Sequence, residues 1–132
     1  MIPVGSPLAF APGSHRIAAH GNGAFAFAGM QHRGSILATP SGVRGLAAET
    51  AADLDPAALA SLFEELGAAP GSIEFLAIGT GAAMVPLLPT LKVALREASL
   101  RFEAMATGPA LRVYNVMQDE GRRVAAALIA AP

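Results

Sequence analysis

Hydrophobic and polar residues alternate in the first third of the chain, and this alternation predicts extended segments. Residues 15–20 and 24–28 are two of them, and a Gly-Asn-Gly run at 21–23 lies between them. Asn-Gly between two extended segments is a strong hairpin signal, because both residues tolerate a positive φ. A third strand is expected over residues 33–39. Residues 15–39 are therefore predicted to form an antiparallel meander.

The spacing of apolar residues then changes and predicts a helix over residues 55–67. Asp55 can cap its N-terminus, Pro56 suits its first turn and Gly67 suits its C-terminal end. Apolar residues fall at i, i+3, i+4 and i+7, the spacing of one helical stripe. The residues of this stripe are Leu59, Leu62, Phe63 and Leu66.

A βαβ unit is expected next. Residues 73–78 are mostly apolar, which is typical of a strand buried on both faces of a sheet. Leucines at helical spacing predict a helix that begins at Pro86 or Pro89, and residues 100–105 form the next expected strand. A strand, a crossover helix and a second strand are expected to be right-handed and parallel.

The last predicted element is a helix over about residues 116–130. Asn115 can cap it, and Gln118 stands three residues on, in a capping-box relation. Residues 1–14, rich in proline and glycine, are expected to form an extended N-terminal arm. Residues 15–132 are expected to form a single α/β domain, a mixed sheet with an N-terminal antiparallel meander, a βαβ unit and helices packed on the sheet.

Composition narrows the classes of function. The chain has 132 residues, a net charge of −1 and no cysteine. Proteins that bind nucleic acid usually carry an excess of basic residues. This chain has no such excess, so nucleic acid is not expected as a partner. The absence of cysteine excludes disulfides, thiol catalysis and cysteine-ligated metals.

Hydropathy gives no sign of a membrane span, although 53% of the residues are hydrophobic. No apolar stretch approaches the roughly 18–20 residues that cross a bilayer. The N-terminus lacks the basic start and apolar run of a secretory signal. A cytoplasmic location is therefore expected.

From residue 15 to the end, the order of motifs resembles a family of small domains of unknown function. Its members include mitochondrial respiratory complex I assembly factor three and a methanogen protein of known fold. The motifs that carry the resemblance are PSGV at 40–43, IGTG at 78–81, EAMATG at 103–108, RVYNVM at 112–117 and EGRRVAAALI at 120–129.

The resemblance implies a three-layer α/β fold and no established catalytic reaction, and the assembly role of the eukaryotic member does not follow from the shared fold. This chain departs from the family pattern at Leu46, where a tryptophan is expected shortly after the turn at residue 40. A pocket wall or partner surface that used this aromatic side chain is not carried over.

Two turns at the carboxyl ends of the parallel strands form a candidate ligand cleft. Ligands of open α/β sheets usually bind outside those strand ends, and a glycine-rich turn can present backbone N–H groups to an anion. The expected connection at residues 107–115 would meet the turn at 79–81. The candidate cleft residues are Gly79, Thr80, Gly81, Thr107, Arg112, Tyr114 and Asn115. Each has an alternative structural role as a tight turn, a cap, a packed ring or a solvated charge.

The known catalytic motifs and metal-binding patterns are missing. A dinucleotide fingerprint needs a third glycine where the chain has Met84, and no Gly-x-Ser-x-Gly elbow occurs. The three histidines, His15, His20 and His32, form no His-x-His pair. No catalytic residue, cofactor or metal is predicted, and the sequence favours a protein that is not an enzyme.

Three hypotheses of function follow. The leading one is a non-catalytic binding or assembly module that acts on protein partners. The second is a binder of an anion or polar metabolite, or an unrecognised enzyme, that uses the candidate cleft. The third is a homo-oligomer built through a face of small side chains on the hairpin, formed by Ala24, Ala26 and Ala28.

Overall fold

The computed structural model describes residues 10–20 and 22–131, and its centre is a six-stranded mixed sheet. Across this sheet the strands are β1 (Phe10–Pro12), β6 (Gly42–Gly45), β5 (Ile36–Thr39), β9 (Val124–Leu128), β7 (Phe75–Gly79) and β8 (Arg101–Met105). β7 is parallel to both β8 and β9, whereas β5 is antiparallel to β6 and β9.

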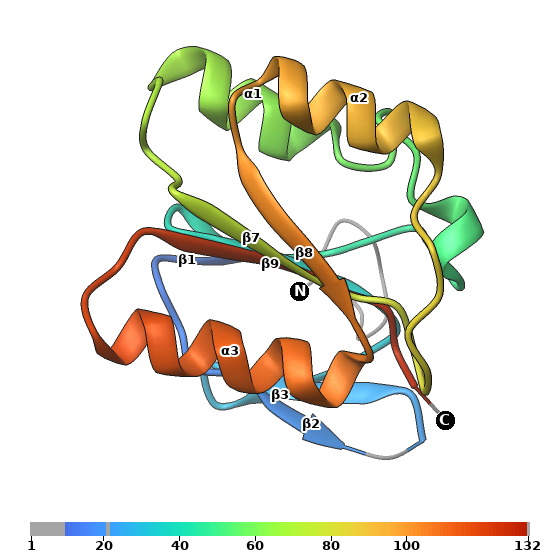
Figure 1. Cartoon of the computed structure of the whole chain (residues 1–132). Helices are drawn as coiled ribbons and strands as arrows, with labels where there is room; N and C mark the ends of the chain where they lie inside the picture. Colours follow the sequence, from blue (N-terminus) through green and yellow to red (C-terminus); the bar gives the residue numbers. More distant parts are fainter. Residues whose placement is uncertain (1–9, 21, 132) are drawn as a thin grey trace.

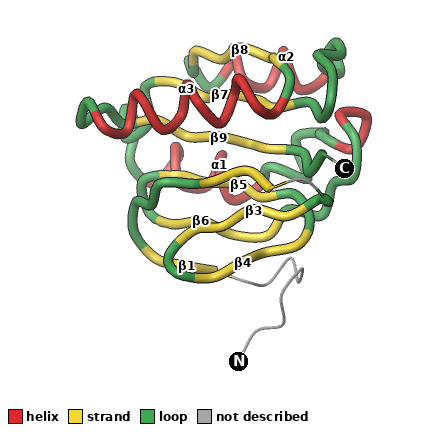
Figure 2. The backbone as a smooth tube through the Cα atoms, turned by 90° about the horizontal axis from the view of Figure 1, so that it is seen from below, coloured by secondary structure: helices red, strands yellow, loops and turns green. Residues whose placement is uncertain are grey.

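Layers on both faces of the sheet complete a three-layer α/β fold, as predicted (Figure 1). The helices α1 (Ala60–Ala68) and α2 (Pro89–Glu97) cover one face. The other face is covered by α3 (Thr107–Asp119) and by a small antiparallel sheet. The strands of this small sheet are β2 (Ala18–His20), β3 (Ala24–Phe27) and β4 (Met30–Arg33). Figure 2 shows α3 running beside β7 and β9, with the small sheet over the opposite half.

Each face of the large sheet buries its own hydrophobic core. Leu76 and Ile78 of β7 point to the core beneath α1 and α2, and Ala77 points to the core beneath α3. This alternation follows from the two-residue repeat of a strand. It explains why residues 73–78 are mostly apolar, because β7 is covered on both sides.

The βαβ unit and the helix after residue 55 are confirmed. β7 and β8 are parallel neighbours joined through α2. The Asp55 carboxylate accepts a hydrogen bond of 2.8 Å from the Ala58 N–H, and a turn there leads into α1. In the predicted stripe, Leu59 and Leu62 are fully buried. Both ends differ from the prediction: α1 begins at Ala60, so Asp55 and Pro56 lie in the turn before it, and Gly67 lies inside the helix, which ends at Ala68.

The predicted strand at 33–39 is two strands in two different sheets. β4 ends at Arg33, and β5 begins at Ile36 in the large sheet. Gly34 between them has φ +101°, a conformation that glycine adopts without strain. The hairpin of β2 and β3 is confirmed, with Asn22 at φ +68° in its turn. The meander is therefore β2–β4, and the chain then crosses to the large sheet.

The predicted helix at 116–130 is wrong in position, because a helix ends where it was expected to begin. α3 ends at Asp119, and Gly121 follows with φ +76°. The Gly121 N–H donates to the Gln118 carbonyl (2.9 Å), and the Arg122 N–H donates to the Met117 carbonyl (3.0 Å). This is a Schellman ending, for which glycine is the favoured residue.

The alanine-rich segment after this ending is β9, a central strand of the large sheet. All five of its residues are buried. Ala125 and Ala127 face the core of α1 and α2, whereas Ala126 faces the core of α3. Alanine favours a helix locally, but burial between β5 and β7 overrides this weak preference. Asn115, predicted to cap a helix here, lies inside α3 instead.

Candidate functional site

Four of the seven candidate cleft residues meet where β7 ends and α3 begins. We call Gly79, Thr80, Gly81 and Thr107 the β7–α3 junction. The Gly81 N–H donates to Thr107 Oγ1 at 2.9 Å, and Thr107 Oγ1 donates to the Ile129 carbonyl at 2.7 Å. The Thr107 N–H in turn donates to the Gly81 carbonyl at 2.8 Å. Thr107 is only 2% exposed, so these bonds tie three segments together in the interior.

Gly79 lets the helix approach the strand closely. A Cβ atom at this position would stand 2.8 Å from the Thr107 Cα and 2.9 Å from its Oγ1. The first of these atoms is backbone, which cannot move without shifting α3 itself. Glycine is therefore required here for packing.

Thr80 fixes the segment that leaves β7. Its hydroxyl donates to the Ala83 carbonyl at 2.8 Å and accepts the Val85 N–H at 3.0 Å. The side chain is 6% exposed. This hydroxyl thus both donates and accepts a hydrogen bond within the protein.

Tyr114 and Asn115 hold the segment that leads into β2. The Asn115 amide accepts the Ile17 N–H at 3.0 Å and donates to the Ile17 carbonyl at 2.6 Å. The Tyr114 hydroxyl donates to the His15 carbonyl and accepts from Gln118, both at 3.2 Å. Burial raises the pKa of Tyr114 to about 12, although the bond from Gln118 opposes this rise.

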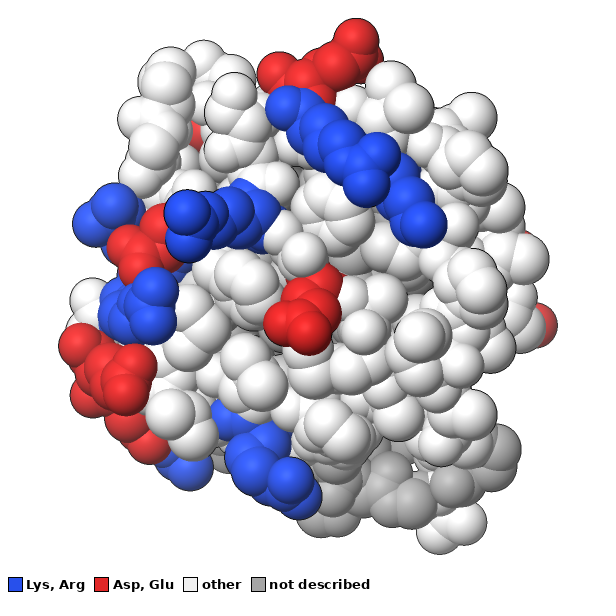
Figure 3. Space-filling view, viewed as in Figure 1, with Lys and Arg blue, Asp and Glu red and all other residues white. Residues whose placement is uncertain are grey.

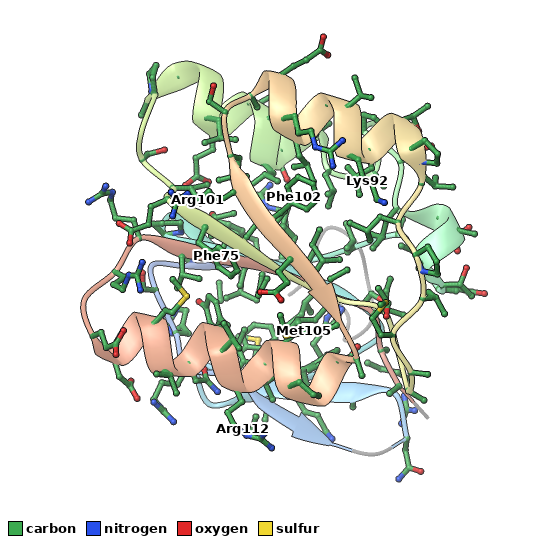
Figure 4. All side chains as sticks on the ribbon, in the orientation of Figure 1. Phe75, Lys92, Arg101, Phe102, Met105 and Arg112 are labelled. Carbon is green, nitrogen blue, oxygen red and sulfur yellow. The ribbon has the colours of Figure 1, made fainter. Side chains whose placement is uncertain are left out.

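Arg112, the last candidate, is exposed on α3. It lines a shallow hollow of about 360 Å³ together with Arg16, Gly108, Leu111, Asn115 and Val116. Figure 4 shows Arg112 on the side of α3 away from the large sheet. Arg16 forms an ion pair with Asp119, which raises the pKa of Arg16.

The candidate residues therefore lie in three places along α3. The β7–α3 junction is at its N-terminus, Tyr114 and Asn115 contact the segment before β2, and Arg112 faces solvent. Thr107 in the junction bonds to the backbone carbonyl of Ile129, and Asn115 bonds to the backbone carbonyl of Ile17. No residue type marks such backbone partners in a sequence, so sequence reasoning missed them.

A polar cluster that the sequence did not point to joins the β5–β6 turn to α1. Glu65 Oε1 accepts from the hydroxyls of Thr39 (2.7 Å) and Ser41 (2.6 Å). The two hydroxyls flank Pro40, which together with Ser41 and Gly42 was the local signal for a turn there. Because Glu65 bonds both, the cluster fixes the turn against the helix.

His32 and His15 both make contacts within the fold. His32 is 3% exposed and lies 6.3 Å from the Phe27 ring, and its burial lowers its pKa. The ring of His15 bonds the Pro12 carbonyl at 2.7 Å. In the part of the chain that the structure describes, no three His, Cys, Asp or Glu residues gather as metal ligands would.

The face of small side chains on the hairpin is not uniformly exposed. Ala24 is buried, Ala26 is half-buried and Ala28 is exposed. A hollow of about 520 Å³ lies at the turn between β3 and β4, beside Phe27 and Met30. Leu46 belongs to the core beneath α1 and α2 and also borders a hollow of about 460 Å³.

The surface around β8 carries no dominant charge. Figure 3 shows acidic and basic side chains scattered over this face and separated by uncharged surface. Within residues 10–20 and 22–131, none of the helices is long and apolar enough to cross a bilayer.

Comparisons with known proteins place the chain among uncharacterised relatives. The family described as "Protein of unknown function (DUF498/DUF598)" matches residues 17–129. An uncharacterised protein of Rhodobacter capsulatus is 36% identical over 120 residues, which cover 91% of this chain and 88% of that protein.

Solved structures share the fold over most of the chain. One is described as an outer membrane protein from Bartonella henselae; it is 40% identical with a TM-score of 0.83, and the match covers 92% of this chain and 98% of that chain. Another is a Mth938-like domain from Bordetella pertussis, 27% identical with a TM-score of 0.75, covering 88% of this chain and 85% of that one.

Proposed function

The chain belongs to this family of proteins of unknown function, and on that premise we propose that it is a non-catalytic module that binds or assembles protein partners. The observation that carries the proposal is that polar side chains near the strand ends already make hydrogen bonds within the chain. Thr80, Thr107 and Asn115 each use a donor and an acceptor in bonds within the chain. A ligand at these groups would have to replace bonds that hold the fold.

The resemblance to mitochondrial respiratory complex I assembly factor three gives the proposal its assembly aspect. A module of this kind acts through its surface, and the buried core of a protein interface is enriched in apolar side chains such as methionine. Four such side chains are 48–60% exposed here: Met30, Met84, Val93 and Val116. They lie on β4, on the segment before α2, on α2 and on α3.

We place this activity in the cytoplasm. The Bartonella henselae relative is described as an outer membrane protein, and that description applies to that protein. Fractionation of host cells checks the location. Recovery of the chain with the membrane fraction after a salt wash would contradict a cytoplasmic module.

Affinity capture from host extract, quantified by mass spectrometry, tests the partner proposal. Baits are the wild type and four single variants, Met30→Ser, Met84→Ser, Val93→Ser and Val116→Ser. Each changed side chain is about half exposed or more, so the variants are expected to fold like the wild type. We expect one or a few proteins on the wild-type bait and their loss from one variant. No protein above an unrelated bait of similar size would contradict the proposal.

A second candidate is a binder of a small anion at the hollow beside α3. Arg16 and Arg112 both line this hollow, next to the polar Asn115 side chain. Guanidinium groups bind carboxylates and phosphates through charge-assisted hydrogen bonds. Arg112 carries the charge that this ligand would need, since Arg16 is paired with Asp119.

A thermal-shift screen with nucleotides, phosphorylated metabolites and organic acids separates the two candidates. A ligand that binds the folded state raises the apparent melting temperature by mass action. The anion candidate predicts a saturable shift that Arg112→Gln abolishes, with Arg33→Gln as the control. No shift across the panel would reject it and leave the protein-binding proposal in place.

A further inference from the structure

The two edges of the large sheet differ in how well they are protected. β1 forms one edge, has three residues and ends in Pro12, which lacks an N–H group. β8 forms the other edge, has five residues and contains no proline. In the described part of the chain no strand pairs with the outer side of β8, which Figure 2 shows at the border of the sheet.

The backbone of β8 has free bonding groups at alternate residues. The Met105 carbonyl accepts the Thr80 N–H at 2.8 Å and therefore faces the β7 side. Because bonding groups alternate along a strand, those of Arg101 and Glu103 also face β7. The N–H and C=O groups of Phe102 and Ala104 consequently point outward. Such an edge is a template for a further strand.

The side chains of β8 are divided between the two layers. Phe102 and Ala104 are half-buried against the core of α1 and α2. Arg101 and Glu103 are both exposed and, by alternation, project to the side of α3. Figure 4 shows Arg101 and Phe102 at the start of this strand and Met105 at its other end. One face of the open edge therefore carries a basic and an acidic residue two positions apart.

We propose that β8 pairs with β8 of a second copy of this chain, antiparallel, about a two-fold axis through Phe102. The outward N–H and C=O of Phe102 then exchange hydrogen bonds with Phe102 of the second copy. The same register sets Arg101 opposite Glu103 of the second copy, and Glu103 opposite its Arg101. Opposite charges directly across an antiparallel pair stabilise it.

Neighbouring registers are less favourable for reasons visible in the strand itself. An axis through Glu103 would set the two Glu103 carboxylates directly opposite each other, and like charges at opposite positions destabilise a strand pair. An axis through Ala104 would use the outward N–H and C=O groups of Ala104. It would set Glu103 opposite Met105 of the second copy, so no carboxylate would lie opposite Arg101. Charge complementarity therefore selects the axis at Phe102, and it selects a second copy because both charges come from the same strand.

A hollow of about 360 Å³ beside β8 adds contact surface to this pairing. Met84, Leu87 and Phe102 contribute apolar lining, and Lys92 and Arg96 contribute basic lining. Met84 is 60% exposed in the single chain. It lies next to the edge that the second copy would cover, so pairing would remove part of its apolar surface from water.

Sedimentation velocity over a range of concentrations, with the full chain, tests the proposal by charge reversal. We expect the wild type to dimerise. Arg101→Glu and Glu103→Arg each turn two attractive pairs into two repulsive pairs, so each is expected to weaken dimerisation by about tenfold or more. The double variant Arg101→Glu/Glu103→Arg restores opposite pairs and is expected to recover the dimer.

The control is Glu64→Arg, which makes the same charge change as Glu103→Arg at an exposed position on α1. It is expected to dimerise like the wild type. A wild type that stays monomeric, single variants that behave like the control, or a double variant that fails to recover would each overturn the proposal. The outcome is independent of the proposed function, because capture of a different protein is measured separately.

Discussion

Replacing Thr107 with valine removes one buried hydroxyl and keeps the volume of the side chain nearly unchanged. The hydroxyl makes two bonds in the β7–α3 junction, from the Gly81 N–H and to the Ile129 carbonyl. Each neutral hydrogen bond contributes about 1 kcal/mol, and a buried N–H left without a partner costs about 1–3 kcal/mol. Thr107→Val is therefore expected to lower the free energy of unfolding by about 2–4 kcal/mol.

Urea unfolding followed by circular dichroism measures this effect, and Thr107→Ser is the matched control. Serine keeps both hydrogen bonds and loses one buried methyl group, at a cost of about 1 kcal/mol. The serine variant should therefore be the more stable of the two. Equal stability of the valine and serine variants, or a more stable valine variant, would refute the argument that this hydroxyl holds the junction.

Three further predictions test other parts of the structure. Gly121→Ala should destabilise the protein by about 1 kcal/mol in urea unfolding, because alanine is strained at φ +76° although its Cβ would meet no other atom within 4 Å; unchanged stability would contradict the Schellman ending. Tyr114 is the only tyrosine and the chain has no tryptophan, so its phenolate absorbance should appear near pH 12; titration near pH 10 would show that the ring is not buried. Burial lowers the pKa of His32 in the folded state, so folding loses stability as the pH falls from about 6.5, the unfolded value, through the lower folded pKa. His32→Gln should flatten the pH dependence of the urea midpoint in this range, and an unchanged slope would mean that His32 does not cause it.

Elements with strong local signals were predictable from the sequence. The β2–β3 hairpin follows from Asn22 in its turn, and α1 follows from one apolar stripe, with Asp55 bonding in the turn that precedes the helix. The parallel β7–α2–β8 unit follows from two extended segments around a leucine-spaced segment. In each case local propensity and burial in the fold favour the same structure.

The errors occurred where local and long-range forces disagree. Residues 124–128 are mostly alanine, which favours a helix, yet β5 and β7 bury them as a central strand. Gly121 was a signal for a helix end, but the predicted helix at 116–130 ran through it. Gly34 likewise marked a break between two strands that alternation alone joined into one.

The candidate cleft was half predictable. The rule that parallel strand ends meet at one edge of a sheet correctly brought the Gly79–Gly81 turn next to Thr107. The bonds to the Ile129 carbonyl could not be foreseen, because they require β9 beside β7. Asn115 was placed by the mistaken helix start, and its contact with Ile17 spans nearly the whole chain.

Two-dimensional ¹H–¹⁵N NMR of the 13.3 kDa chain tests whether the β7–α3 junction serves the fold alone, with function left to protein contacts. The amides of Gly81 and Thr107 report on this junction during titration with nucleotides, phosphorylated metabolites and organic acids. If the junction is structural, we expect neither amide to show a saturable shift with any of these compounds, whereas a partner found by capture shifts surface residues. A selective, saturable shift of the Gly81 and Thr107 amides with one class of metabolite would contradict a purely structural role and identify the junction as a ligand site.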